Sequence, residues 1–262
     1  MKALISFINP TIKALAIFIP GILLSFTFDV FTPLVYFLFI LIVTFTMSDI
    51  PFIKWLKIFS PFLLVALSFA WMTILYTNQT FSYGEVLFTL FGSEITRGSI
   101  ITGISLALRS LCFVCLSILF ALTTNSTKFM LSLMQQCKVS PKITYGILAG
   151  YRFLPMFRDE LQILRQAHRI RGFGRTKGIK GKWQQFRRYS IPLLANGIRK
   201  AERVAIAMES KGFTGDTDRT YYHEMNVSPK DWMFFFLIVG AFFIILAFSY
   251  YLGYLNIFGK QF

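Results

Sequence analysis

Five stretches of the chain lack charged residues over lengths that suit membrane helices. They cover residues 14–28, 30–48, 58–84, 98–127 and 232–259, and only the fourth is interrupted, by Arg109. About 20 apolar residues in a helix cross the hydrocarbon core of a bilayer. The first run is short, and we expect it to be extended by Lys13 directing its ammonium group to the bilayer surface. The sequence therefore predicts an all-α membrane protein with about five transmembrane helices.

The composition supports this class. Hydrophobic residues make up 55% of the 262 residues and charged residues only 15%, whereas a soluble domain carries about 25% charged residues. A soluble fold of this size cannot bury so much apolar surface, which argues against an ordinary cytosolic enzyme. The three cysteines lack the spacing of a disulfide or zinc framework, and Cys112 and Cys115 are expected to be inert thiols inside a helix.

Most of the surplus positive charge lies in one polar insert. Residues 128–223 hold 19 of the 27 basic residues but only six of the 12 acidic ones, a net charge of +13. We therefore expect three regions: a membrane domain over 1–122 with four helices, a basic insert over 123–230, and a last transmembrane helix over 231–262.

The positive-inside rule orients the chain. Lys54 and Lys57 mark the loop between the second and third runs as cytoplasmic, so the 77–99 loop faces outside. The basic insert and the N-terminus are then cytoplasmic and the C-terminus is outside. No small-x-small cleavage site follows the first run, so we expect that run to be an uncleaved first helix.

Arg109 lies near the middle of the fourth run. A charge at that depth costs a few kcal/mol and should face protein or water. Two roles are open for this buried intramembrane charge, a contact to a neighbouring subunit or a structural hydrogen-bond hub, and we favour the hub.

Several helices are predicted in the insert. Ser126 or Thr127 is expected to cap a short helix, and residues 143–154 suit an interfacial segment. A long amphipathic helix follows Pro155 and ends at Gly172. The basic, glycine-rich residues 172–182 are expected to form a flexible link suited to anionic lipid headgroups. A second amphipathic helix starts near Ser190 and ends at Gly212.

The two amphipathic helices end in the same way, with a cation, a glycine and a phenylalanine. The first ends in Arg169-Ile170-Arg171-Gly172-Phe173, and the second in Glu209-Ser210-Lys211-Gly212-Phe213. A cation at a helix C-terminus complements the helix dipole. The pattern fits two ordinary caps, or two matched basic tips that are offered to a partner with two similar acidic surfaces.

These residues resemble the transmembrane T component of energy-coupling factor (ECF) transporters. The stretch Ala207–Phe213 is similar to a signature of that family, Ile170-Arg171-Gly172 matches a related motif, and Asn9–Lys13 is similar to its opening stretch. Position 211 departs from the family pattern, since Lys stands where Arg is usual. Lys keeps the charge and loses the bidentate geometry of a guanidinium.

The resemblance implies a non-catalytic subunit of an ATP-driven importer in the bacterial plasma membrane. Its partners would be two cytoplasmic ABC-type ATPase subunits and a membrane-embedded S component that binds a vitamin or a transition-metal ion. The resemblance makes the amphipathic helices coupling helices, with Arg171, Gly172, Lys211 and Gly212 docking on the ATPases. Arg169, Glu209 and Ser210 would support the tips, and the chain itself would bind no cofactor and no metal.

Other functions fit the sequence less well. A membrane-embedded enzyme or metal site would have to use Asp216, Asp218, His223 and Glu224, which read more simply as a solvated loop. ATP hydrolysis lacks a P-loop, because Trp183 follows Gly181-Lys182. Nucleic-acid binding is disfavoured because the basic helices carry apolar faces. A self-contained permease or channel remains the main alternative.

Overall fold

The computed structural model describes residues 4–76, 86–90, 93–172, 178–253, 256–257 and 260–261. It divides into two compact units. Unit 1 is made of Met1–Ser132 and Met225–Phe262, and unit 2 of Leu133–Glu224. The division falls inside the predicted basic insert of residues 123–230.

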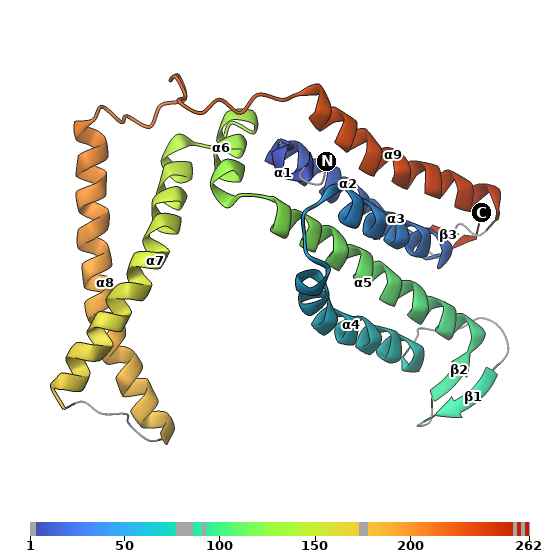
Figure 1. Cartoon of the computed structure of the whole chain (residues 1–262). Coiled ribbons are helices and arrows are strands. Elements are labelled where there is room, and N and C mark those ends of the chain that lie inside the picture. The colour runs from blue at the N-terminus through green and yellow to red at the C-terminus, as the bar shows by residue number, and fades with distance from the viewer. Residues whose placement is uncertain are drawn as a thin grey trace. The chain divides into compact units, whose positions relative to one another are not determined.

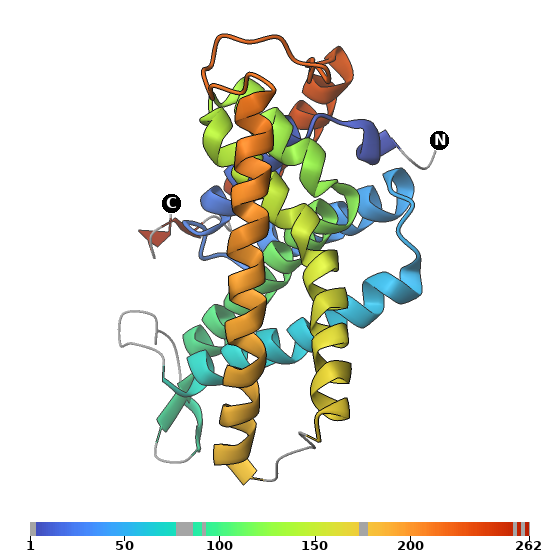
Figure 2. The ribbon, with the colours of Figure 1, turned by 90° about the vertical axis from the view of Figure 1, so that its left-hand side faces the viewer.

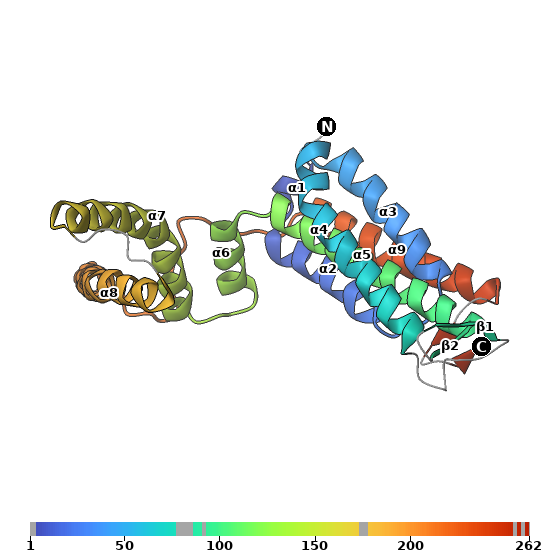
Figure 3. The same ribbon diagram turned by 90° about the horizontal axis from the view of Figure 1, so that it is seen from below.

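Unit 1 is a bundle of apolar helices (Figures 1 and 3). Three are long and apolar enough to cross a membrane, α4 (Phe52–Leu75), α5 (Arg97–Thr123) and α9 (Pro229–Tyr251), and two are shorter, α2 (Pro10–Leu24) and α3 (Phe31–Met47). They coincide with the five uncharged runs, so the predicted all-α membrane fold is confirmed. A single turn, α1 (Leu4–Phe7), precedes them.

Helix α5 occupies the middle of the bundle, in contact with α2, α3 and α4, while α9 packs on α2 and α3. Aromatic rings fill much of the interior. Tyr36 meets Phe242 edge-on at 5.2 Å between ring centroids, and Trp55 stacks on Phe59 at 4.5 Å. Cys112 and Cys115 are buried in the same cluster, as expected of thiols inside an apolar helix.

A polar clamp joins the helix ends at which α2 and α9 begin and α5 ends. Both oxygens of the Asp231 carboxylate accept backbone N–H groups, from Asn9 at 2.8 Å and from Ser228 at 2.7 Å. The Thr11 hydroxyl donates to Ser132 at 2.8 Å. Lys13 is 1% exposed and donates to the carbonyl of Thr123, the last residue of α5, at 3.1 Å; its direction toward the bilayer surface stays a prediction. Inside the bundle the ammonium group gains a fixed acceptor, which replaces water.

Two short antiparallel hairpins complete unit 1, and the sequence did not predict either. Strand β1 (Val86–Leu90) pairs with β2 (Ser93–Thr96), and β3 (Asn256–Ile257) with β4 (Lys260–Gln261). The first lies in the predicted 77–99 loop, of which residues 77–85 and 91–92 are outside the described residues.

Unit 2 contains the long helices α7 (Pro141–Ile170) and α8 (Gly178–Ser210). The prediction that the long helix starts only after Pro155 is wrong, because α7 runs from Pro141 through Pro155 without a break; an interfacial position of residues 143–154 stays a prediction. Proline removes the hydrogen bond to the carbonyl four residues earlier. Both Pro155 and Tyr151 are exposed, so solvent can satisfy that carbonyl.

Two predicted helix starts are also wrong. Helix α8 begins at Gly178, not near Ser190, so residues 178–182 of the predicted 172–182 link belong to this helix. Residues 173–177 lie outside the described residues. Helix α6 (Ser126–Gln136) bridges the two units in sequence, and its cap is Asn125. The Asn125 side-chain oxygen accepts from the N–H groups of Thr127 and Lys128 at 2.9 and 3.3 Å.

The clamp yields a stability prediction. Asp231→Asn leaves one acceptor oxygen and turns an amide NH2 group toward a buried backbone N–H, so it should cost about 1–3 kcal/mol. Asp216→Asn removes a carboxylate from an exposed loop and is the matched control. Thermal unfolding of the purified protein in detergent measures the difference. Equal melting temperatures for the two variants would show that the clamp contributes nothing.

Candidate functional site

The first basic tip is the C-terminus of α7, where the backbone hydrogen bonds of the last turn are regular. The N–H of Arg171 donates to the carbonyl of Ala167 at 3.1 Å, and that of Gly172 to Arg169 at 3.2 Å. Gly172 has a φ of 77°, which glycine adopts without strain. Arg169 and Arg171 are both exposed. The local sequence therefore presents two guanidinium groups at the negative end of the helix dipole.

The second tip is a Schellman cap. The N–H of Phe213 donates to Met208 at 3.0 Å, and that of Gly212 to Glu209 at 2.9 Å, with a φ of 81° at Gly212. The hydroxyl of Ser210 donates to the carbonyl of Ala207 at 3.1 Å. These bonds satisfy carbonyl groups of the last turn and leave Lys211 exposed.

The two tips lie at opposite ends of the helix pair. Helix α7 and helix α8 run in opposite directions and cross, so that α7 ends at the same end of the pair at which α8 starts (Figures 1 and 2). The Arg171 tip is at one end of the pair and the Lys211 tip is at the other. A single flat partner surface is therefore a poor match for both tips, whereas two separate binding surfaces would suit them.

The crossing is built from residues in equivalent positions of the two helices. Glu160 and Lys200, 40 residues apart, form an ion pair. Phe157 and Gly197 have the same separation, and a Cβ atom added at Gly197 would lie only 2.9 Å from the Phe157 ring. Arg171 and Lys211 share this separation too. Each tip therefore lies equally far beyond the crossing, about 21 Å along its helix.

Aromatic rings hold the second tip against the start of α7. The ring of Phe213 meets Tyr145 edge-on at 5.5 Å. The guanidinium of Arg219 lies 5.0 Å from the Tyr145 ring, 5.3 Å from that of Phe213 and 5.9 Å from that of Tyr221. Cation–π contacts of this kind are worth about 0.5–1 kcal/mol at exposed sites. The position of Phe213, and with it that of the tip, is thereby fixed from two sides.

A cavity of about 490 Å³ adjoins the second tip. Its walls include Lys211, Gly212, Asp216, Asp218 and Arg219. Both cations and carboxylates line it, so this tip offers charged hydrogen-bonding groups of both signs. The charged residues described at the first tip, Arg169 and Arg171, are both positive. The two ends of the helix pair therefore differ in the charges they present.

The acidic loop after the second tip does not assemble as a metal site. Across residues 4–76, 86–90, 93–172, 178–253 and the short C-terminal strands, no three His, Cys, Asp or Glu side chains gather in a group able to hold a metal ion. The His223 ring contacts Tyr222 at 4.7 Å, and its carbonyl accepts from Gln135 at 2.7 Å. The arrangement of this loop therefore gives no support to the alternative that the chain is a metal-dependent enzyme.

Arg109 lies in unit 1, where it binds the segment between α2 and α3. It is 8% exposed and donates to the carbonyls of Ser25, at 3.3 Å, and Thr27, with Phe28 stacked at 4.8 Å. Beside it, the backbone carbonyl of Asp29 accepts from Ser105 at 2.7 Å. These contacts are those of a hydrogen-bond hub, and a role toward another subunit stays a prediction.

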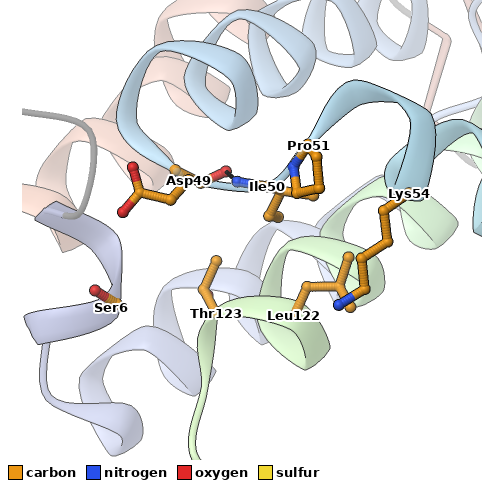
Figure 4. A pocket seen from close by; sticks show the side chains of 8 residues that line it. Ser6, Asp49, Ile50, Pro51, Lys54, Leu122 and Thr123 are labelled. Carbon is orange, nitrogen blue, oxygen red and sulfur yellow. Dashed lines mark hydrogen bonds between the residues drawn. The ribbon is translucent and has the colours of Figure 1, made fainter.

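A small hollow of about 150 Å³ lies where α1, the loop between α3 and α4, and the end of α5 meet (Figure 4). Asp49 and Lys54 line it from different sides, with Thr123 between them and Ser6 on the side of Asp49. Sequence reasoning missed this hollow, whose only sequence signal is the pair of charged residues Asp49 and Lys54 around the start of α4.

Comparison with known proteins identifies the family. The model of the CbiQ family, described as cobalt transport protein, matches residues 1–222. The chain belongs to the CbiQ family. It is 28% identical over 252 residues to the "energy-coupling factor transporter transmembrane protein EcfT" of Streptococcus equi, covering 91% of this chain and 90% of the relative. The protein of the same name from Bacillus subtilis is 24% identical over 194 residues, 71% of this chain and 72% of the relative.

The family assignment confirms the resemblance that the two tips and the opening Asn9–Lys13 stretch indicated. Sequence reasoning located the tips but missed the crossing and the contacts of Phe213 with Tyr145 and Arg219. A signal for the crossing was present, because α8 repeats the cation-Gly-Phe ending of α7 at a spacing of 40 residues and carries a glycine, Gly197, in its interior.

The crossing can be tested by filling its notch. Gly197→Leu places a large side chain against Phe157 and should force α7 and α8 apart. Gly150→Leu is the control, since a Cβ atom there meets nothing within 4 Å. Spin labels at exposed Arg165 and Ala205 report the separation. We expect a longer, broader distance distribution for Gly197→Leu alone, and an unchanged distribution would refute this packing.

Proposed function

We propose that the chain is the coupling subunit of an ECF-type importer, which transmits ATPase movement to a substrate-binding S component. The observation that carries the proposal is the matched pair of basic tips at equal distances from one crossing. Two similar ATPase subunits would offer two similar acidic grooves, and tips at opposite ends of one rigid pair can reach both. Arg171 with Gly172, and Lys211 with Gly212, are the docking groups in this proposal.

The supporting residues have distinct roles in the proposal. Arg169 adds a second exposed cation to the first tip. Glu209 and Ser210 belong to the last turn of α8, where the Ser210 hydroxyl and the Schellman bonds fix the direction of Lys211. Because Arg219 and Tyr145 hold Phe213, they position the second tip without belonging to the docking surface.

The subunit itself is proposed to be non-catalytic and to bind no cofactor. ATP hydrolysis would belong to the two cytoplasmic ATPases, and the vitamin or transition-metal site to the S component. The name of the relatives, energy-coupling factor transporter transmembrane protein, supports such a membrane complex. The family description refers to cobalt transport, which is compatible with a metal-ion substrate.

The proposed setting is the bacterial cell membrane, with unit 2 in the cytoplasm. Lys54, Lys57 and the +13 charge of residues 128–223 support this orientation. A docking role for the tips requires it, because ATP-driven subunits of an importer work from the cytoplasmic side.

The orientation can be tested with a native thiol. Cys137 is exposed, whereas Cys112 and Cys115 are buried. A membrane-impermeant maleimide should label Cys137 only after the cells are opened. Leu252 follows the last residue of α9, on the side predicted to face outside. In a Cys137→Ser background, Leu252→Cys should therefore react in intact cells. Labelling of Cys137 in intact cells would contradict the orientation.

Docking and simple helix capping predict free-energy changes of different size when the cation is removed. A cation gains only about 0.3–1 kcal/mol from the helix dipole, whereas truncating one partner of a desolvated charge pair costs about 2–5 kcal/mol of binding. Arg171→Ala should therefore strongly weaken ATPase co-purification and uptake while the protein stays monodisperse. Lys211→Ala should have a smaller effect, and Lys211→Arg should be tolerated or tighten the complex, because a guanidinium binds a carboxylate bidentately.

The matched control for these variants is Arg158→Ala, which removes an exposed cation from α7 far from either tip. The Arg171→Ala, Lys211→Ala double variant should lose the complex. If it keeps full co-purification and full uptake at matched expression, the tips are only helix caps and the proposed coupling role is wrong.

A further inference from the structure

The first turns of α8 carry an apolar stripe that the fold leaves uncovered. Ile179 is 90% exposed, Trp183 67% and Phe186 61%, and the indole of Trp183 stacks on the Phe186 ring at 5.8 Å. At 100° per residue these three side chains share an arc of about 60° on one face of the helix. Beyond the crossing this part of α8 diverges from α7 (Figures 1 and 2), so α7 does not cover the stripe.

Cations border the stripe on both sides. Lys182 lies along one edge, and Lys180 and Arg187 along the other; all three are exposed, as is Arg188 farther round the helix. The sequence holds no acidic residue between Gly178 and Ala201. The segment therefore combines large apolar and aromatic side chains with an unbroken positive charge.

We propose that residues 178–191 lie in the headgroup region of an anionic bilayer, as a second membrane contact separate from the spanning helices. A helix that binds in this way buries a Trp- and Phe-bearing face at the acyl boundary and directs Lys and Arg to the lipid phosphates. Flanking cations suit this position because their alkyl stems lie on the apolar surface while the charged groups reach the headgroups.

Charge complementarity favours a lipid surface over a protein partner. Anionic lipids attract basic segments through many equivalent phosphates, and each Lys or Arg near such a surface contributes about fivefold to binding. Unit 2 also belongs to the same chain as helices that are long and apolar enough to cross a bilayer, so a bilayer is present wherever these helices are inserted. The inference does not depend on the docking of the two tips, which lie outside this segment.

The contact can be measured by spin-label accessibility in the full-length protein. A label at Ile179→Cys, in a Cys137→Ser background, keeps both aromatic rings of the stripe. In nanodiscs of phosphatidylcholine with phosphatidylglycerol, this label should become accessible to oxygen and protected from a water-soluble nickel relaxant. The matched label at Gln184→Cys, on another face of the same turns, should stay accessible to the nickel relaxant.

Charge variants distinguish binding to anionic lipid from apolar association that does not depend on charge. Lys182→Gln with Arg187→Gln should weaken the lipid-bound state about 25-fold, given about fivefold for each cation. Arg199→Gln with Arg203→Gln removes the same charge from another exposed part of α8 and should leave the protection unchanged. Phosphatidylcholine alone, or high salt, should abolish the protection.

Two outcomes would overturn the proposal. Equal nickel accessibility at position 179 with and without phosphatidylglycerol would show that this helix does not lie on an anionic bilayer. Protection that arises only after ATPase or S-component subunits are added would assign the stripe to a protein interface. Loss of ATPase binding in the tip variants, with protection at position 179 retained, would leave the lipid contact standing by itself.

Discussion

The buried carboxylate of Asp231 joins the first and last membrane helices of the bundle. Asp231 is 3% exposed and accepts the backbone N–H groups of Asn9 and Ser228. In an apolar environment an unpaired N–H or carboxylate is costly, so each of these groups requires the others. Lys13 and Thr11 extend the same network to α5 and α6. Apolar packing alone has little directional preference between helices in a bilayer, and the polar clamp supplies it.

In unit 2 the positions of the contact residues along α7 and α8 determine the arrangement of the two helices, and little of their surface is buried. Its long helices touch through a notch at Gly197 and the ion pair of Glu160 with Lys200, and most of their surface stays exposed. A single half-exposed ion pair contributes at most about 1 kcal/mol, so the crossing specifies alignment more than stability. Equal arms on either side of the crossing would let a displacement at one tip produce a comparable displacement at the other.

The sequence predicts best what depends on local composition. The five uncharged runs became five helices, and glycine with a preceding cation marked both tips correctly, because helix ends are determined within a few residues. Contacts between distant residues were not predictable in this way. Nothing around Asp231 indicates that its partner is Asn9, and nothing around Lys13 indicates that its acceptor is the carbonyl of Thr123. Pro155 misled the prediction because a proline breaks a helix only where the freed carbonyl cannot find another partner. The docking roles of Arg171 and Lys211 remain predictions.

The order of the elements along the chain has a consequence for biosynthesis. Asn9 and Asp231 are separated by 222 residues, and all of unit 2 is translated between them. At about 5–20 residues per second, the ribosome needs roughly 11–44 s to pass from one to the other. During that time the faces of α2 and α3 that will pack on α9 must be covered by lipid or by the insertion machinery. The membrane bundle is therefore one of the last parts of this protein to close, although its first helix is among the earliest made.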